Sequence, residues 1–270
     1  MRKDYIAAAE PADHETEFVE KYWTAVWQKE GGPQGQIDRI PRRDEYRAMA
    51  PYLAQLPKAA RVLDGGCGLG DWTLYFARNG FSVTGLDLSR QTVEQLQARF
   101  PEVEFVDGDI RRTGFPDSSF DAYFSWGVFE HFESGLQDCV GEAFRVLKPG
   151  GLLFVSVPLD NLRHGIRGAL ARPRPAGNKL RFYQWRLTRA ELAQELGIGG
   201  FDVLDVQPIN KRQGILRSLH HEFGLPYEWL LTKGLSVLLA PLIPGSLIAH
   251  MVIAVARKPD NGAQHSGQGR

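Results

Sequence analysis

The fold of this chain is decided by a short apolar run that leads into a glycine-rich turn, VLDGGCGLG at residues 62–70. Val62 and Leu63 read as the end of a buried strand, and the glycines read as the tight turn after it. Glycines let the backbone pass close to a ligand, and the helix expected from about Trp72 offers free N–H groups at its start. The stretch therefore predicts a strand–turn–helix unit with a ligand at the turn.

Short apolar runs continue to alternate with helical segments after this turn. Further strands are expected over residues 81–86, 103–106, 120–126, 152–157, 201–206 and 251–256. Such alternation predicts βαβ units. We therefore expect an α/β, Rossmann-like fold with a seven-stranded, mostly parallel sheet and helices on both faces. The last strand, which follows a long excursion of the chain, is expected to run antiparallel.

The α/β domain is expected over residues 59–258, preceded by an N-terminal helical cap over residues 1–58. Two insertions interrupt the domain, a lid at 159–187 and a hydrophobic stretch at 209–249. The polar, Gly-rich residues 259–270 are expected to form a disordered tail.

Composition excludes several classes of protein. Among 270 residues, Lys plus Arg number 32 and Asp plus Glu number 32, so no basic excess points to a nucleic-acid partner. Two cysteines without repeated spacing argue against a disulfide framework and a zinc site. With no signal peptide visible at the N-terminus, a reducing, cytoplasmic setting is expected.

Polar residues stand at the carboxyl ends of successive expected strands, where open parallel sheets bind ligands. Asp87 lies 19 residues after Gly68 and can accept hydrogen bonds from both hydroxyls of a ribose. Asp109 can accept from the exocyclic amine of adenine. Ser125 and Trp126 are expected to form the floor of the same crevice.

The spacing of the glycines discriminates between cofactors. A dinucleotide-binding turn needs a third glycine at position 71, where this chain has Asp71. A carboxylate at the start of that helix repels a pyrophosphate but is compatible with a cofactor that carries a sulfonium and an ammonium. The P-loop pattern is also absent. An NAD-dependent oxidoreductase is therefore the less favoured alternative.

Several segments in order resemble the motifs of class I S-adenosylmethionine-dependent methyltransferases. They are residues 62–70, 85–89, 107–110, 115–121 and 145–151. The resemblance is closest to the small-molecule subgroup related to ubiquinone-type methyltransferases. It is strong over residues 60–158 and weaker over 185–208 and 250–258. The resemblance implies S-adenosylmethionine as the cofactor and a small molecule as the methyl acceptor.

The resemblance also implies roles for individual residues. It assigns the methionine part of the cofactor to Asp64, Gly65, Gly66, Gly68 and Ser125. It assigns the ribose and the adenine to Asp87, Leu88, Asp109 and Ile110. Any one of these acids taken alone could equally form a loop or cap a helix. The whole set at these spacings is far more specific than one glycine turn.

Glu130 and His131 follow the fourth expected strand, near the expected reaction centre. Methyl transfer is an in-line displacement that depends on alignment, and some oxygen or nitrogen acceptors also need a base. His131 is the candidate base, with Glu130 orienting it or binding substrate; alternatively the pair only fixes the loop. Ubiquinone-type relatives can carry a further Glu three positions earlier, where this chain has Gly127, so no metal is expected.

The two insertions are expected to select the acceptor. Residues 160–189 hold eight basic residues and one acid, with aromatic residues between them, which suits a lid over an anionic acceptor or simply a solvated loop. Residues 234–256 hold no Asp, Glu, Lys or Arg, but Pro241, Pro244 and Gly245 argue against a membrane span. Residues 211–249 form a core-covering helix, a dimer contact or a peripheral membrane surface for a lipid-like acceptor.

The N-terminal aromatics Tyr22, Trp23 and Trp27 either cap the cofactor crevice or only pack their helix on the sheet. Taken together, the sequence predicts a methyltransferase for a small, anionic or amphiphilic metabolite. A non-catalytic S-adenosylmethionine-binding protein is the main alternative. The identity of the acceptor and the oligomeric state stay open.

Overall fold

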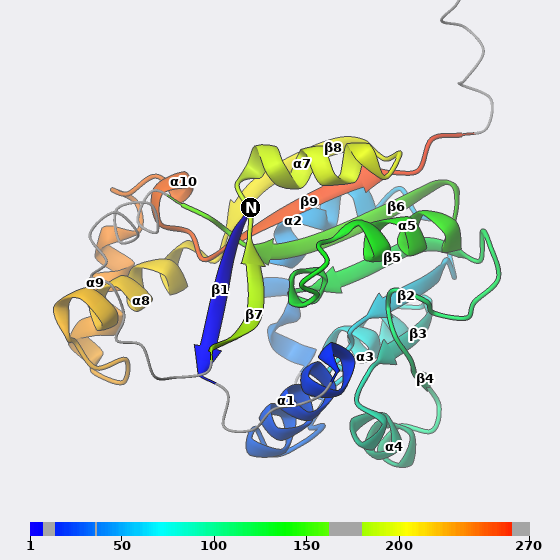
Figure 1. The fold of residues 1–270 in the computed structure, drawn as a ribbon, viewed down its shortest axis with the longest axis horizontal. Helices are drawn as coiled ribbons and strands as arrows, with labels where there is room; N and C mark the ends of the chain where they lie inside the picture. Colours follow the sequence, from blue (N-terminus) through cyan, green and yellow to red (C-terminus); the bar gives the residue numbers. More distant parts are fainter. Residues whose placement is uncertain (8–13, 36, 162–179, 261–270) are drawn as a thin grey trace, which may run out of the picture.

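The computed structural model describes residues 1–7, 14–35, 37–161 and 180–260. Its centre is a seven-stranded sheet with the order β4-β3-β2-β5-β6-β9-β8 (Figure 1). The strands are β2 (Arg61–Gly65), β3 (Ser82–Asp87), β4 (Glu104–Asp107), β5 (Phe120–Trp126), β6 (Leu147–Pro158), β8 (Asp202–Ile209) and β9 (Met251–Arg257). The pairs among β4, β3, β2, β5 and β6 are parallel, whereas β9 runs antiparallel to both β6 and β8. The expected Rossmann-like sheet with an antiparallel last strand is confirmed.

Helices cover both faces of this sheet. One face packs against α2 (Asp44–Leu53), α3 (Asp71–Arg78) and α4 (Arg90–Arg99), and the other against α5 (Gln137–Val146) and α7 (Arg189–Ile198). Neighbouring strand residues feed opposite cores, since Leu63 and Tyr123 pack with α5 and α7 while Val62 and Phe124 pack with α3 and α4. A sheet buried on both faces explains why its strands read as nearly continuous apolar runs.

Helix starts follow the capping residues in the sequence. The Ser89 hydroxyl accepts a hydrogen bond from the Thr92 N–H at the start of α4. At the start of α7, Thr188 and Glu191 form a reciprocal capping box. These side chains satisfy N–H groups that a helix leaves unpaired, and thereby fix where the helices after β3 and β7 (Leu180–Arg186) begin.

The N-terminal region is not helical throughout. It contains the helices α1 (Glu15–Lys29) and η1 (Ile37–Arg42), but it opens with the strand β1 (Arg2–Ala7). β1 pairs antiparallel with β7, and β7 is the last part of the insertion over 159–187 that was expected to form a lid. This two-stranded sheet cannot be predicted from local sequence, because its two strands lie about 180 residues apart and no local pattern links them. Residues 162–179 of that insertion and 261–270 of the expected tail lie outside the described residues.

The hydrophobic insertion forms three helices beside the sheet, at the left of Figure 1. They are α8 (Lys211–Phe223), α9 (Leu230–Leu239) and α10 (Gly245–Ile248). Among the residues that the structure describes, no helix has the length and apolar character needed to cross a bilayer.

Candidate functional site

A cavity of about 300 Å³ opens where β2, β3, β4 and β5 end. Its walls come from the glycine turn after β2, from the loops after β3, β4 and β5, and from α1 across the opening. Of the predicted site residues, seven line it: Gly66, Gly68, Asp87, Leu88, Asp109, Ile110 and His131. The cavity therefore lies where an open α/β sheet is expected to bind its ligand.

The glycine turn is fastened to the end of β3. The N–H groups of Gly66 and Cys67 donate to the Leu86 carbonyl oxygen at 2.7 and 3.0 Å. Gly66 has a φ of +79°, and a Cβ there would lie 2.4 Å from Cγ2 of Val128. Glycine is thus required for both backbone conformation and space, and the turn presents its backbone to the cavity.

Asp87 completes this connection with its carboxylate. Its Oδ2 accepts from the Gly68 N–H at 2.8 Å, and its Oδ1 accepts from the Ser89 N–H at 2.9 Å. Burial raises the pKa of Asp87, while these backbone N–H groups lower it. Each carboxylate oxygen keeps a further lone pair, so the fixed group can still accept from a ligand diol in the cavity.

Asp64, Gly65 and Ser125 lie beneath the turn and do not line the cavity. The Thr73 hydroxyl donates to Asp64 Oδ2 at 2.7 Å, and the Ser125 hydroxyl donates to the Gly65 carbonyl oxygen at 3.0 Å. Burial raises the pKa of Asp64 to about 7. These residues support the turn from the interior, one layer below the positions that the resemblance implies for cofactor contact.

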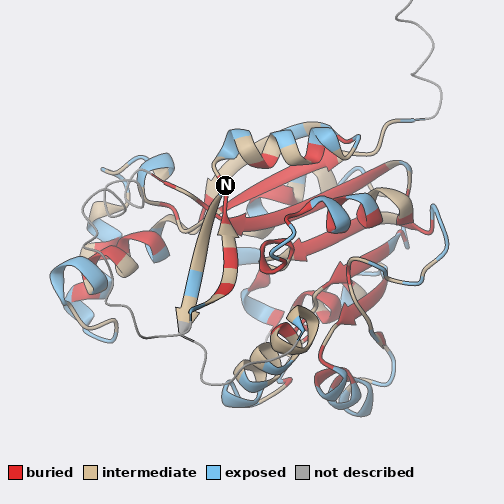
Figure 2. Cartoon of the chain, viewed as in Figure 1, coloured by how far each residue is buried: buried red, intermediate tan, exposed pale blue. Residues whose placement is uncertain are grey.

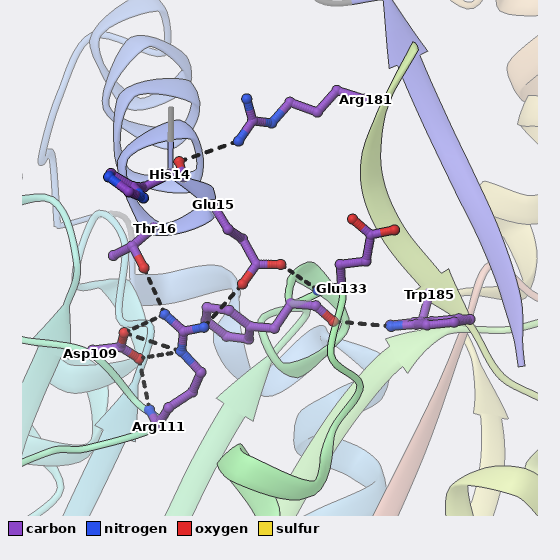
Figure 3. Close-up of polar contacts among 9 residues, drawn as sticks. His14, Glu15, Thr16, Asp109, Arg111, Glu133, Arg181 and Trp185 are labelled. Atoms are coloured by element: carbon purple, nitrogen blue, oxygen red, sulfur yellow. Dashed lines mark hydrogen bonds and ion pairs between the residues drawn. The ribbon is translucent and has the colours of Figure 1, made fainter. Parts of the chain in front are cut away.

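Asp109 is held by a clamp that sequence reasoning did not detect (Figure 3). The Arg111 guanidinium donates to both Asp109 carboxylate oxygens, at 2.7 Å from Nη2 to Oδ2 and at 3.0 Å from Nε to Oδ1. The same guanidinium reaches Glu15 at 3.0 Å and the Thr16 hydroxyl at 2.8 Å. This Arg111 clamp therefore ties the loop after β4 to the first turn of α1.

Aromatic rings form much of the remaining cavity wall. Trp23 and Trp27 of α1 stack with ring centroids 5.1 Å apart, and Trp72 and Trp126 lie 5.0 Å apart. The indole Nε1 atoms of Trp27 and Trp126 are buried without a hydrogen-bond partner in the described part of the chain. Of the two expectations for the N-terminal aromatic residues, Trp23 and Trp27 agree with the one that places them over the crevice. Tyr22 instead packs on Tyr183.

The charges around the cavity are mostly acidic. Glu20, Glu30 and Asp71 line it together with Asp87 and Asp109. The cation among these lining residues, Arg43, lies 3.7 Å from the Asp71 carboxylate. An acidic wall lined with aromatic rings favours a cationic ligand over a pyrophosphate.

His131 and Glu130 belong to the short helix η2 (Phe129–His131), but only His131 lines the cavity. Nδ1 of His131 lies 2.8 Å from the Tyr183 carbonyl oxygen, which can only accept, so Nδ1 carries the proton and Nε2 keeps its lone pair. Burial lowers the pKa of His131 to about 4, although the backbone groups of Tyr183 and Gly127 act in the opposite direction and raise it. The imidazole is thus neutral at pH 7.

Glu130 lies in the interior and does not reach the cavity. It is 2% exposed, and its Oε2 has no hydrogen-bond partner among the described residues. Burial raises the pKa of Glu130 to about 8, although the charge of Arg186 lowers it. The predicted catalytic pair is therefore separated by the turn of η2, with one member in the cavity and the other behind it.

The described basic residues of the first insertion do not line the cavity. Arg181 donates to the His14 carbonyl oxygen, Arg186 pairs with Asp4 at 2.6 Å, and Arg189 donates to the Val206 carbonyl oxygen. The other basic residues, Arg163, Arg167, Arg172, Arg174 and Lys179, lie outside the described residues. An anion-binding lid stays a prediction, as does the expected independence from metals.

The fold is Rossmann-like, and the cavity lies at the carboxyl edge of the sheet, where proteins of this fold bind nucleoside-containing cofactors. Residues 62–151 match the family model described as a methyltransferase domain. Over this part the chain is similar to S-adenosylmethionine-dependent methyltransferases that act on small molecules. S-adenosylmethionine is the cofactor of that family.

Two curated relatives and one solved structure illustrate the similarity. A "Probable S-adenosylmethionine-dependent methyltransferase" of Mycolicibacterium smegmatis is 35% identical over 144 residues, covering 53% of this chain and 52% of that protein. The 2-methyl-6-phytyl-1,4-hydroquinone methyltransferase of Synechocystis sp. is 35% identical over 133 residues, covering 47% and 42%. The chain thus matches about half the length of these relatives.

The same fold is seen in the 1,6-didemethyltoxoflavin-N1-methyltransferase of Burkholderia thailandensis, solved with 1,6-didemethyltoxoflavin and S-adenosylhomocysteine. Its TM-score is 0.58 at 19% identity, and the alignment covers 96% of each chain. At this identity the likeness shows a shared fold over nearly the whole chain.

Proposed function

We propose that this chain is an enzyme that binds S-adenosylmethionine in the cavity and transfers its methyl group to a small-molecule acceptor. The observation that carries the proposal is the glycine turn fastened to Asp87 within an acidic, aromatic cavity. The turn brings backbone groups to the cofactor, and the acids complement its positive sulfonium and ammonium.

Each part of the cofactor has residues suited to hold it. The fixed carboxylate of Asp87 accepts from the ribose hydroxyls, and Leu88 and Ile110 offer apolar contacts to the adenine. Asp109 accepts from the adenine amine with the lone pairs that Arg111 leaves free. The backbone of Gly66 and Gly68 contacts the methionine part. Asp64, Gly65 and Ser125 keep the turn in place from beneath.

The transfer itself is an in-line displacement. A lone pair of the acceptor attacks the methyl carbon while the carbon–sulfur bond breaks, and neutral S-adenosylhomocysteine leaves. The chain contributes alignment and a water-poor aromatic surrounding. Neutral His131, with Nε2 unprotonated, takes the acceptor's proton when the acceptor is an acid too weak to ionise alone. Glu130 positions η2 from the interior.

The acceptor that fits this cavity is aromatic or amphiphilic rather than anionic. Tryptophan rings make up much of the described wall, and acidic residues there outnumber cations. A carboxylate or phosphate entering this region meets repulsion from Glu20 and Glu30.

We also propose a cytoplasmic location and no nucleic-acid partner. Cys67 and Cys139 are both free thiols, which is compatible with a reducing compartment. The formal net charge of zero gives no sequence-wide attraction to a polyanion.

Calorimetry with S-adenosylmethionine, S-adenosylhomocysteine and NADH tests the cofactor assignment. We expect both sulfur compounds to bind and NADH not to bind. Methyl-labelled S-adenosylmethionine, incubated with aqueous and organic metabolite extracts, then tests turnover. Binding without transfer to any extract would instead favour a non-catalytic S-adenosylmethionine-binding protein, and binding of NADH alone would favour an oxidoreductase.

A further inference from the structure

The helices of the second insertion expose large apolar side chains. Leu230, Leu238 and Leu242 are 86%, 69% and 75% exposed. Others on the same segment are Phe223, Trp229, Leu231, Val237 and Leu247. In Figure 2, where pale blue marks exposed residues of every type, this helical segment carries pale blue turns on its outer side. A concentration of this kind, rather than scattered single residues, marks a surface that contacts something apolar.

The packing of α9 is inverted relative to an amphipathic helix in water, because its buried residues are the small polar Thr232 and Ser236. α8 buries the small residues Gly214 and Ser218 together with the apolar Ile215 and Leu219. The hydroxyls of Thr232 and Ser218 have no hydrogen-bond partner within the described ranges. An amphipathic helix in water buries its leucines, whereas helix pairs in lipid meet through small residues and turn their leucines outward. The pattern therefore points to lipid as the occupant.

A basic groove adjoins this apolar surface. It lies between the starts of α2 and α8, and the residues that line it include Arg42, Lys211 and Arg212 as well as Ala240 and Pro241 at the end of α9. Four basic residues line the groove against two acids, Asp44 and Glu45, so its net charge is positive. Asp44 accepts a hydrogen bond from the Asn210 N–H at 2.9 Å, and Glu45 accepts one from the Asn210 side-chain amide at 2.7 Å. Positive charge beside exposed leucines complements an anionic lipid surface.

We propose that this face of the molecule docks peripherally on an anionic lipid bilayer. Leu230, Leu238 and Leu242 enter the headgroup–acyl boundary, and Arg42, Lys211 and Arg212 contact the headgroups. A second copy of the chain is the competing occupant, but burial of a self-complementary patch does not require a cationic rim at its side.

The docking surface lies next to the candidate active site. Arg43 lines both the basic groove and the cofactor cavity. If the proposed methyl transfer holds, a membrane-resident amphiphile with a polar aromatic or similar headgroup can reach the cavity along this side. This substrate class rests on the proposed function, whereas the docking itself does not.

Vesicle flotation with the full chain tests the docking. We expect the wild type to float with vesicles of phosphatidylcholine and phosphatidylglycerol, and less with phosphatidylcholine alone. For the variant Leu230→Gln/Leu238→Gln/Leu242→Gln, the fraction of protein bound to vesicles should be at least about tenfold lower than for the wild type. The variant Arg42→Gln/Lys211→Gln/Arg212→Gln should lose the preference for anionic vesicles. Ile198→Gln, at an exposed apolar position on α7, is the matched control and should float like the wild type.

Two outcomes of the flotation assay overturn the proposal. Either the wild type stays with the sedimented fraction for both vesicle types, or the leucine variant floats like the wild type. Light scattering that finds a wild-type dimer and a monomeric leucine variant would also overturn it and assign the face to a second copy. Calorimetry on the same variants separates the two proposals, since docking without S-adenosylmethionine binding refutes the methyl-transfer function alone.

Discussion

At the scale of single residues, Asp87 and the pair Glu130–His131 show how position changes chemistry. Asp87 has both carboxylate oxygens fixed by backbone N–H groups and still faces the cavity. Glu130 and His131 are neighbours in sequence, yet burial raises the pKa of one to about 8 and lowers that of the other to about 4. Both are therefore mostly neutral at pH 7 despite being ionisable residues.

Replacing the Asp87 carboxylate should weaken cofactor binding. Asp87→Asn removes the charged acceptor for the ribose hydroxyls, so the affinity for S-adenosylmethionine should fall roughly 10- to 100-fold in calorimetry. Asp107→Asn, an exposed position at the end of the neighbouring strand β4, is the control and should bind like the wild type. If the wild type and both variants bind S-adenosylmethionine with equal affinity, Asp87 does not contribute to the cofactor site.

Glu130 should make stability depend on pH. Above its ordinary pKa of 4.5 the unfolded chain loses this proton, while the folded chain keeps it up to about pH 8, so stability falls across that window as pH rises. The variant Glu130→Gln cannot lose this proton and so escapes this decrease. The unfolding free energy of the variant minus that of the wild type should therefore rise by more than about 1 kcal/mol from about pH 5 to about pH 8. Denaturant melts measure it. A pH-independent difference would contradict the raised pKa.

His131 should affect turnover rather than cofactor binding. If it takes the acceptor's proton, His131→Ala should lower kcat about 100-fold and leave the affinity for S-adenosylmethionine nearly unchanged. Because its folded pKa is about 4, it should add no inflection to the pH–rate profile at neutral pH. His221→Ala, on the exposed end of α8, is the control. Undiminished kcat in His131→Ala would leave His131 a structural role only.

At the scale of elements, α1 is a cover held mainly by its edges. Val19 is the buried residue of this helix. Polar contacts attach it elsewhere, including Thr24 with Ser89 at 2.6 Å, Gln28 with Gln91 at 3.0 Å and the Arg111 clamp. An element with few buried apolar contacts opens more readily than the sheet. Opening of α1 uncovers the cavity that Trp23 and Trp27 close.

Release of the Arg111 clamp should loosen α1. Arg111→Met removes charge-assisted bonds to Glu15, Thr16 and Asp109, so amide exchange in α1 should accelerate about tenfold. Arg112→Met changes an exposed neighbour and should leave the exchange of α1 unaltered. Hydrogen exchange followed by mass spectrometry compares the two, and faster exchange spread evenly over the chain would indicate general destabilisation instead.

At the scale of the whole molecule, one sheet with a core on each face holds the cavity at its carboxyl edge. Strand alternation and helix caps could be predicted from the sequence because they follow from local apolar periodicity and turn residues. The antiparallel direction of β9 was expected as well, but local periodicity does not determine strand direction. The β1–β7 sheet could not be predicted, because β-pairing over such a separation leaves no local pattern. The separation of Glu130 from His131 also depends on how η2 packs.

Cofactor binding should stabilise the whole molecule. S-adenosylhomocysteine at about 100 times its Kd should add roughly 2.7 kcal/mol to the unfolding free energy, and NADH should add nothing. Gly66→Ala should abolish this gain, because its Cβ would lie 2.4 Å from Val128 at a φ of +79°. Gly80→Ala at a φ of +88° has no neighbour within 4 Å, so it should cost stability but keep the gain. Thermal melts with and without ligand measure both.

The sequence by itself determined the class of fold, the place of the glycine turn and the acid at the end of β3. These features are encoded by residues close together in the chain, where spacing alone constrains geometry. Only the tertiary structure decided which predicted residues face the cavity, that Asp109 shares its carboxylate with Arg111, and that the second insertion turns its leucines outward. Arg111 and Glu15 are 96 positions apart, and burial is set by all elements packed together, so no local pattern contains this information.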